Sequence, residues 1–206
     1  MKFYNSGGPN PRMVRMFMAE KGFDVPKVDV DLRGGENRRE PYLRVNPAGQ
    51  TPALELDDGT VLAEITAICE YVDEKKKDTP SLIGDTPEER ATTRMWTRRI
   101  DLNIAEPALN GFRFAEGLKM FQNRVRCIPQ AADDLKATAR DKLAWLDKLL
   151  GSQPFIAGNK FSMADILLFA MLDFMKGVGQ PLDPANKNLA AWKERVAARP
   201  SVAASA

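Results

Sequence analysis

The sequence predicts an α/β unit followed by an all-helical unit. Short apolar runs alternate with helical patterns in the first third of the chain, and every apolar pattern in the rest has helical spacing. Between the two, Asp78-Thr79-Pro80-Ser81 interrupts the alternation. A chain of 206 residues can form one large domain or two small ones. We therefore expect a first domain over residues 1–78, a linker over 79–86 and a helical domain over 87–206.

The first domain is predicted to have the element order βαβαββα. Its four strands are the short apolar or alternating runs 1–5, 27–32, 53–56 and 60–62. The last two are joined by Asp57-Asp58-Gly59, a turn typical of a hairpin, so we expect both parallel and antiparallel pairing in one sheet. The alternating run at 27–32 predicts a half-buried strand.

Three helical patterns accompany these strands, two between strands and one after the last strand. Asn10-Pro11 opens the first helix, with Asn10 as its N-cap and proline at the first helical position, and Gly22 ends it. The charged stretch 36–44 predicts a short or irregular helix. A third helix follows the hairpin over residues 65–74.

The second domain shows four helical patterns. In the first, Pro107 forces a kink or a break, and the next covers residues 135–150. Ser162 and Asp165 have the spacing of a helix start signal, and the run after them is apolar nearly all round, which predicts a buried helix. A last amphipathic helix carries residues 189–196.

Composition excludes several kinds of function. Lysine and arginine number 30 against 28 acidic residues, which indicates neither nucleic-acid binding nor an acidic tail. The chain has no histidine, so histidine-based catalysis and metal binding are excluded, and its two cysteines lack the spacing of a zinc, iron–sulfur or dithiol site. We expect no metal. The polar start of the chain and its short apolar runs predict neither a signal peptide nor a membrane span, and we expect a reduced, cytoplasmic protein.

Three strings resemble the cytosolic glutathione S-transferase family. They are NPAGQTPAL at 46–54, LAEITAI at 62–68, and FIAG with FSMAD within 155–165, in the order that the family shows. The resemblance implies a thioredoxin-like fold for the first domain, an all-α second domain, and glutathione as co-substrate. Gly8-Pro9-Asn10-Pro11 further resembles the Pro-Asn turn of the nu class.

The resemblance also implies a glutathione site. A cis proline at Pro52 would aim the backbone of Thr51 at the cysteinyl part of glutathione, as in strand addition. Glu64 and the helix N-terminus after it would hold the γ-glutamyl end. The family has serine after this glutamate, whereas this chain has Ile65, so Thr66 next to it would supply the hydroxyl. The expected glutathione-binding residues are Arg12, Arg38, Gln50, Thr51, Pro52, Glu64, Ile65 and Thr66.

The residue that activates the thiol decides the mechanism. A free cysteine-type thiol has a pKa of about 8.5, and lowering it by two units requires about 2.7 kcal/mol in favour of the thiolate. The family uses tyrosine, serine or cysteine near the end of the first strand; here the candidates are Tyr4, Ser6 and Asn10. We expect Asn10 first, because an N-cap accepts through its side-chain oxygen and leaves the amide nitrogen free to donate to sulfur. Ser6 is the second catalytic candidate, and the N–H of Arg12 is the first backbone donor.

Three functions remain open. The first is a glutathione transferase that conjugates the thiolate to hydrophobic electrophiles, with Phe112 and Phe114 lining the co-substrate pocket. The second is a glutathione-dependent disulfide reductase or peroxidase of the nu type, and the third a non-catalytic glutathione-binding scaffold. By the same resemblance we expect a homodimer. The balanced charge and the short apolar runs predict no nucleic acid or membrane as partner.

Overall fold

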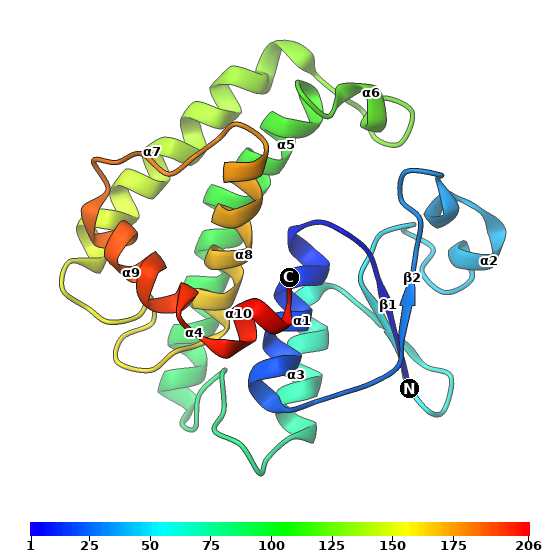
Figure 1. Ribbon diagram of the computed structural model, residues 1–206, viewed down its shortest axis with the longest axis horizontal. Helices are drawn as coiled ribbons and strands as arrows, with labels where there is room; N and C mark the ends of the chain where they lie inside the picture. The colour runs from blue at the N-terminus through cyan, green and yellow to red at the C-terminus, as the bar shows by residue number, and fades with distance from the viewer. The chain divides into compact units, whose positions relative to one another are not determined.

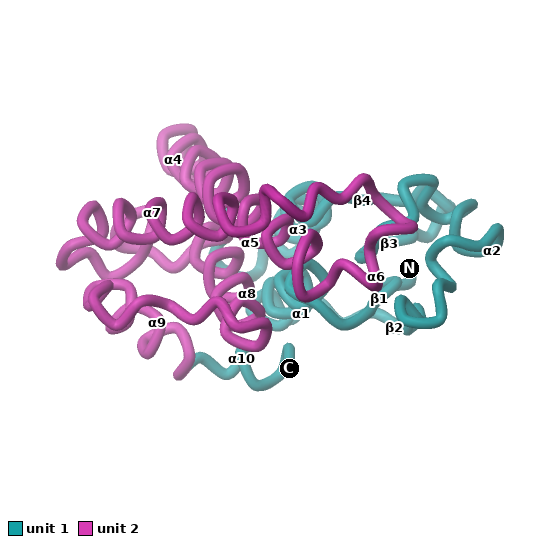
Figure 2. The backbone as a smooth tube through the Cα atoms, turned by 90° about the horizontal axis from the view of Figure 1, so that it is seen from above, with its two compact units in different colours: residues 1–83, 199–206 teal, residues 84–198 magenta.

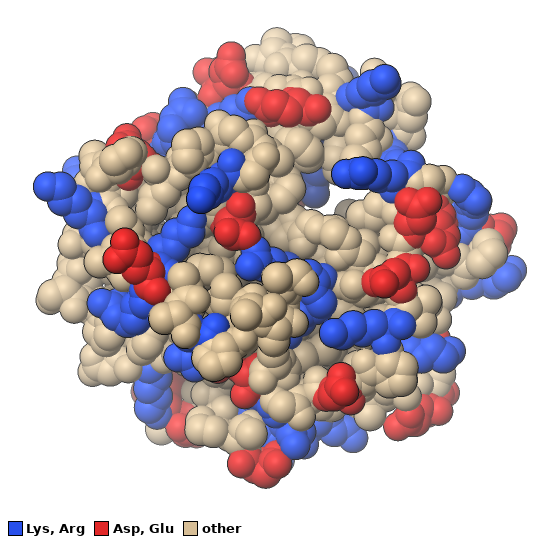
Figure 3. Space-filling model, in the orientation of Figure 1, with Lys and Arg blue, Asp and Glu red and all other residues tan.

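The computed structural model describes residues 1–206, which divide into two compact units (Figure 2). Unit 1 comprises residues 1–83 and 199–206, and unit 2 comprises residues 84–198. Unit 1 is α/β and unit 2 is all helical, so the predicted fold class is confirmed. Basic and acidic side chains are interspersed over the face in Figure 3. None of the helices combines the length and the apolar character needed to span a membrane.

Unit 1 contains one sheet of four strands in the order β2-β1-β3-β4. Strand β1 is parallel to β2 and antiparallel to β3, and β3 is antiparallel to β4. The predicted element order and hairpin are therefore confirmed. The elements of this unit are β1 (Lys2–Asn5), α1 (Pro9–Lys21), β2 (Lys27–Asp29), η1 (Glu36–Arg38), α2 (Glu40–Leu43), β3 (Ala53–Glu55), β4 (Val61–Ala63), α3 (Ile65–Lys75) and α10 (Pro200–Ala204).

Helices α1 and α3 lie together on one side of strands β1 and β2 (Figure 1). The side chains of Phe3, Phe17, Leu54 and Ile68 are completely buried, and they come from both helices and both central strands. Burying one such side chain contributes about 1.5–3 kcal/mol. The core thus fixes the end of β1 and the starts of α1 and α3.

Strand β2 differs from the sequence prediction. It is shorter than expected and all three of its residues are exposed, with Val28 38% exposed. Of the alternating apolar residues, Val30 is buried, and it lies just beyond the strand. The reason is that β2 is an edge strand with a single neighbour, so fewer side chains are available to cover it.

The last eight residues also differ from the prediction, which placed them in the helical domain. Residues 199–206, here called the C-terminal segment, belong to unit 1. Arg199 donates to both carboxylate oxygens of Glu20 on α1 over 2.7 Å, and the hydroxyl of Ser201 donates to the same carboxylate. These bonds attach the segment to α1, and helical periodicity in the sequence does not show them.

Unit 2 is a helical bundle. Its elements are α4 (Pro87–Ile100), η2 (Asp101–Ala105), α5 (Glu106–Phe114), α6 (Leu118–Phe121), η3 (Pro129–Ala131), α7 (Ala132–Leu150), α8 (Met163–Gly177) and α9 (Lys187–Ala197). Segment η2 is a π-helical turn between α4 and α5. Pro107 cannot donate an N–H and its ring would clash with the carbonyl one turn earlier, so the wider turn replaces the predicted kink or break.

Helix α8 begins with the predicted capping arrangement. Ser162 is its N-cap, and the carboxylate of Asp165 accepts from the Ser162 N–H over 3.0 Å. The same carboxylate accepts from the backbone N–H of Ile156 over 2.9 Å and from the indole N–H of Trp192 over 2.8 Å. Both Asp165 and Trp192 are fully buried. This network fixes α8 as the buried centre of unit 2, as the sequence predicts.

Candidate functional site

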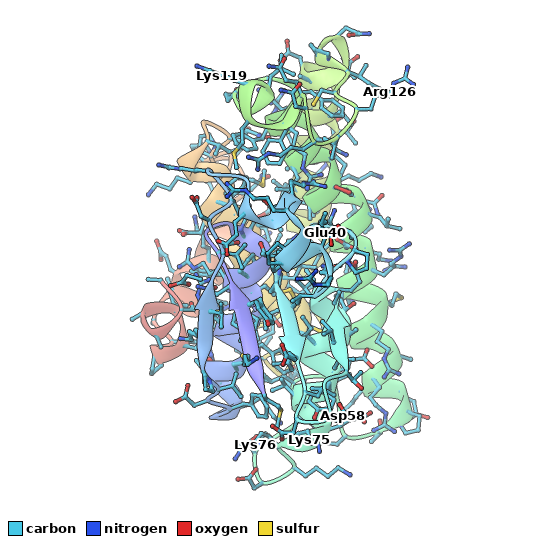
Figure 4. All side chains as sticks on the ribbon, turned by 90° about the vertical axis from the view of Figure 1, so that its right-hand side faces the viewer. Glu40, Asp58, Lys75, Lys76, Lys119 and Arg126 are labelled. Atoms are coloured by element: carbon cyan, nitrogen blue, oxygen red, sulfur yellow. The ribbon has the colours of Figure 1, made fainter.

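Three chain segments meet at one end of the sheet in unit 1. In the pairing of the strands, Ala53 faces Tyr4 on one side and Ala63 on the other. The next positions along these ladders bring Ser6, Thr51 and Glu64 to the same end. The hydroxyl groups of Ser6 and Thr51 are hydrogen bonded at 2.5 Å. Asp58, in the β3–β4 turn, marks the opposite end of the hairpin (Figure 4).

The start of α1 corrects one sequence prediction. The helix begins at Pro9, two residues before the predicted first position, and its N-cap is Gly8 with φ 113° and ψ 171°. No side chain caps this helix, so Asn10 is not the N-cap. Glycine adopts this positive φ without a steric penalty, which lets the chain enter the helix directly behind Ser6. Asn10 instead occupies the second helical position and is partly exposed.

The first turn of α1 offers one backbone donor. Residues 9 and 11 are prolines and have no N–H, and the N–H of Arg12 donates to the carbonyl of Gly8 over 3.4 Å. The expectation that Arg12 supplies the first free N–H is therefore wrong, and that position belongs to Asn10. Asn10 thus combines its backbone N–H and its side-chain amide at the positive end of the helix dipole.

The other two thiol candidates have defined partners. Tyr4 donates its hydroxyl to the Glu55 carboxylate over 2.7 Å, and that hydrogen bond raises the pKa of Tyr4 above its usual value. Ser6 is 6% exposed, and its hydroxyl contacts Thr51 as well as the carbonyl of Gly7 at 3.2 Å. Tyr4 is therefore directed to the β3 strand, whereas Ser6 lies at the meeting point of the three segments.

The peptide bond between Thr51 and Pro52 is cis, and Pro52 is buried. The peptide that precedes it is held by two side chains. The hydroxyl of Tyr42 and the amide nitrogen of Asn46 both donate to the Gln50 carbonyl, over 2.7 and 2.8 Å. That carbonyl and the Thr51 N–H share one planar peptide and point in opposite directions. The two bonds therefore fix the direction of the Thr51 N–H.

Tyr42 and Asn46 received no role in the sequence analysis. Asn46 opens the string of residues 46–54, but the string does not show that its amide reaches the Gln50 carbonyl four residues later. Tyr42 is 4% exposed, and burial raises its pKa to about 12. It therefore stays protonated and remains a donor throughout the neutral pH range. No sequence signal identifies this contact.

The loop around Gly49 brings Arg38 close to this peptide. Asn37 donates its amide to the Gly49 carbonyl over 2.6 Å, and Arg38 donates to the Ala48 carbonyl over 3.5 Å. Gly49 has φ 61°, and a Cβ atom there would lie 2.8 Å from the Asn37 carbonyl oxygen, so this close approach requires glycine. The side chains of Arg38 and Gln50 are both exposed. They are accessible to a ligand.

Glu64 has an unusual backbone conformation at the start of α3. It is exposed, it is the N-cap residue, and it is the one non-glycine residue with positive φ, at φ 69° and ψ 123°. Such a conformation costs on the order of 1–3 kcal/mol and marks functional positions more often than others. No side chain caps α3. The N–H groups of Ile65 and Thr66 therefore point out of the helix beside Glu64, as an anion site requires.

Phe112 and Phe114 lie on α5 in unit 2. The Phe112 ring packs edge-to-face against Phe174 at 5.3 Å and against Phe121 at 6.0 Å. Phe114 is 9% exposed. Phe112 therefore has packing partners inside unit 2 and Phe114 is buried, and their place in a co-substrate pocket stays a prediction.

Comparisons with known proteins find family profiles and relatives that match most of the chain. The family profile for "Glutathione S-transferase, N-terminal domain" matches residues 7–75, and that for "Glutathione S-transferase, C-terminal domain" matches residues 129–195. The chain is 37% identical to glutathione S-transferase 2 of Saccharomyces cerevisiae over 202 residues, covering 95% of this chain and 84% of that protein. It is 31% identical to maleylacetoacetate isomerase of Pseudomonas aeruginosa over 172 residues, covering 82% and 78%. The crystal structure of Gtt2 from Saccharomyces cerevisiae superposes with a TM-score of 0.93 at 34% identity, covering both chains completely.

Proposed function

The chain belongs to the glutathione S-transferase family, and on that premise we propose that unit 1 binds glutathione as its thiolate for transfer to hydrophobic electrophiles. The observation that carries this proposal is the meeting of Ser6, Thr51 and Glu64 at one end of the sheet. Each of the three segments offers a different type of group, and together these match the groups of a γ-glutamyl tripeptide.

The peptide part of glutathione binds along Thr51. The fixed Thr51 N–H and the Thr51 carbonyl form hydrogen bonds with the cysteinyl residue, as when a peptide adds to a strand. The γ-glutamyl carboxylate lies on the N–H groups of Ile65 and Thr66, where the helix dipole favours an anion. Glu64 accepts from the ammonium group at the same end. The exposed side chains of Arg38 and Gln50 bind the glycine carboxylate.

The thiol then lies over the start of α1. There the sulfur meets the Asn10 backbone N–H, the Asn10 amide and the Ser6 hydroxyl. Hydrogen bonds to a charged acceptor contribute about 1.5–3 kcal/mol each, so two of them reach the roughly 2.7 kcal/mol that a two-unit lowering of the thiol pKa requires. Neither residue is a base, so the proton leaves to solvent. The site thus stabilises a nucleophile and orients it, without general-base chemistry.

Substitution of Asn10 separates catalysis from binding. In Asn10→Ala the backbone N–H stays while the amide is lost, so we expect retained glutathione binding with slower turnover. Ser6→Ala is the second test, because it removes the other side-chain donor to the sulfur while keeping the turn. Equal turnover in both variants and in the wild type would contradict the role of these donors and favour the non-catalytic scaffold.

Two other functions are distinguished by substrate. A disulfide and a chloronitroaromatic compound, given in parallel with glutathione, separate the nu-type reductase from the transferase. Turnover of the disulfide alone would overturn the transferase proposal. One relative is named maleylacetoacetate isomerase, and family membership alone does not fix the reaction, so maleylacetoacetate is a third test substrate.

We also propose a cytoplasmic homodimer in which residues 1–78 form the glutathione-binding domain. Both cysteines are free, which agrees with a reducing compartment. Four large apolar residues on α4, η2 and α7 are exposed by 40–48%: Met95, Leu102, Trp145 and Leu149. A dimer that covers them would remove apolar surface from water. Sedimentation of the purified protein tests this, and a monomer at micromolar concentration would contradict it.

A further inference from the structure

Arg15 connects the end of β1 with the C-terminal segment. Its guanidinium donates to the side-chain oxygen of Asn5 over 2.7 Å and to the carbonyl of Ser6 over 3.2 Å. The other side of the same group donates twice to the carbonyl of Ser205, over 3.1 and 2.8 Å. One side chain on the second turn of α1 thus holds the Ser6 turn from behind and fastens it to the last residues of the chain.

The position of the Ser205 carbonyl is itself fixed. The C-terminal segment is attached to α1 by the pair of hydrogen bonds from Arg199 to Glu20, with Ser201 as a third donor. Ser205 is completely buried, and its N–H donates to the Ser201 carbonyl over 3.0 Å. The C-terminal segment is therefore bound to α1 at two places, at Glu20 and at Arg15.

All four hydrogen bonds of Arg15 go to neutral acceptors. A partly buried charge is normally paired with an opposite charge, because removing it from water is costly. The charged groups that act on Arg15 are Arg12 on the same helix, which opposes its charge, and Asp29 at the end of β2, which favours it. Asp29 is exposed and accepts from the Asn5 amide over 2.6 Å. Burial and Arg12 lower the pKa of Arg15 and Asp29 acts in the opposite direction, and an arginine stays charged in neutral solution.

The geometry points to Arg15 as a positioning residue of the thiol site: it holds the Ser6 turn on the C-terminal segment and directs a positive charge that favours thiolate over thiol in bound glutathione. This inference rests on the proposed function. Within the chain the exposed Asp29 is the acidic group that favours this charge, and the ligand sulfur would be a second anion on the side of the Ser6 turn. The C-terminal segment takes part in this positioning because its Ser205 carbonyl accepts two hydrogen bonds from Arg15.

A pH titration of glutathione bound to the full-length protein tests this, with the ultraviolet absorbance of the thiolate as readout. Arg15→Gln keeps hydrogen-bonding capacity and removes the charge, so we expect the thiol pKa to rise by about one unit. Arg15→Lys keeps the charge and loses the forked contact, and we expect an intermediate value. The control is Arg195→Gln in α9, where the lost arginine donates to the Pro154 carbonyl over 2.8 Å. It changes the net charge equally and should leave the thiol pKa unchanged.

A thiol pKa equal to that of the wild type in Arg15→Gln would overturn the inference. If this variant does not fold, Arg199→Gln decides, because it releases the C-terminal segment and leaves Arg15 in place; an unchanged thiol pKa there overturns the inference as well. The proposed function fails in a different way. In that case the wild type itself binds no glutathione, or binds it with an ordinary thiol pKa.

Discussion

Two substitutions of Glu64 separate the effect of its backbone conformation on stability from the effect of its carboxylate on ligand affinity. Both Glu64→Ala and Glu64→Gly remove the carboxylate, but only glycine relieves the positive φ of 69°. Relief is worth about 1–3 kcal/mol, against which glycine costs about 0.5–1 kcal/mol through the entropy of the unfolded chain. We therefore expect Glu64→Gly to be more stable than Glu64→Ala, by about 1 kcal/mol and at most about 2.5 kcal/mol.

The effect on affinity should be the same in both variants. Each loses a hydrogen bond between a carboxylate and the ammonium group of the ligand, worth about 1.5–3 kcal/mol, so glutathione should bind about 10- to 100-fold more weakly. Urea unfolding measures the first quantity and calorimetry the second. Asp58→Ala, at the far end of the hairpin (Figure 4), is the control and should bind glutathione normally.

Two results would refute this reasoning. If Glu64→Gly were no more stable than Glu64→Ala, the backbone at this position would not carry the cost assigned to it. If both variants bound glutathione as tightly as the wild type, the strained residue would have no role at the γ-glutamyl end.

Three further predictions concern side chains around the site. Tyr42→Phe removes one of the two hydrogen bonds to the Gln50 carbonyl, which fix the direction of the Thr51 N–H. Calorimetry should therefore show about 2- to 12-fold weaker glutathione binding, and unchanged affinity would argue against a role of the Tyr42 bond. Lys21→Met removes a buried ammonium group and leaves Asp73, which is 10% exposed, without its ion pair at 3.0 Å. The free energy of unfolding in urea should fall by about 3–5 kcal/mol, and a loss below about 1 kcal/mol would be inconsistent with this pair. For Glu20, burial raises the pKa, but the bonds from Arg199 and Ser201 outweigh it and hold the pKa below its usual value. The contribution of the Glu20 carboxylate to the free energy of unfolding is present above the unfolded pKa and is lost as the pH falls through the folded pKa. Between about pH 6 and about pH 3.5, Glu20→Gln should therefore lose less stability than the wild type. Parallel losses in the two proteins would contradict this.

The fold was predictable because local signals and tertiary structure agree. The hairpin turn at Asp57-Asp58-Gly59, the helix end at Gly22 and the capping pair Ser162 and Asp165 each depend on nearby residues only. Such short-range chemistry is visible in a sequence without an alignment.

The errors occurred where distant residues or the backbone conformation decide. The C-terminal segment has a helical composition, but its attachment to Glu20 crosses most of the chain. The start of α1 shifted because Gly8 turns the chain through backbone conformation, which a search for polar N-cap side chains misses. Arg15 and Tyr42 could not be assigned from sequence, because each donates to a backbone carbonyl. Arg15 donates to Ser205 at the other end of the chain, and Tyr42 donates to Gln50. A backbone acceptor leaves no pattern of side chains in the sequence.

Calorimetry of glutathione binding near pH 6, in two buffers of different ionisation enthalpy, tests most directly whether the protein stabilises the thiolate. The thiolate account predicts that binding releases a proton to the buffer, so the observed enthalpy differs between the buffers in proportion to their ionisation enthalpies. Equal binding enthalpies in the two buffers would show that the thiol binds with its proton and would contradict the account.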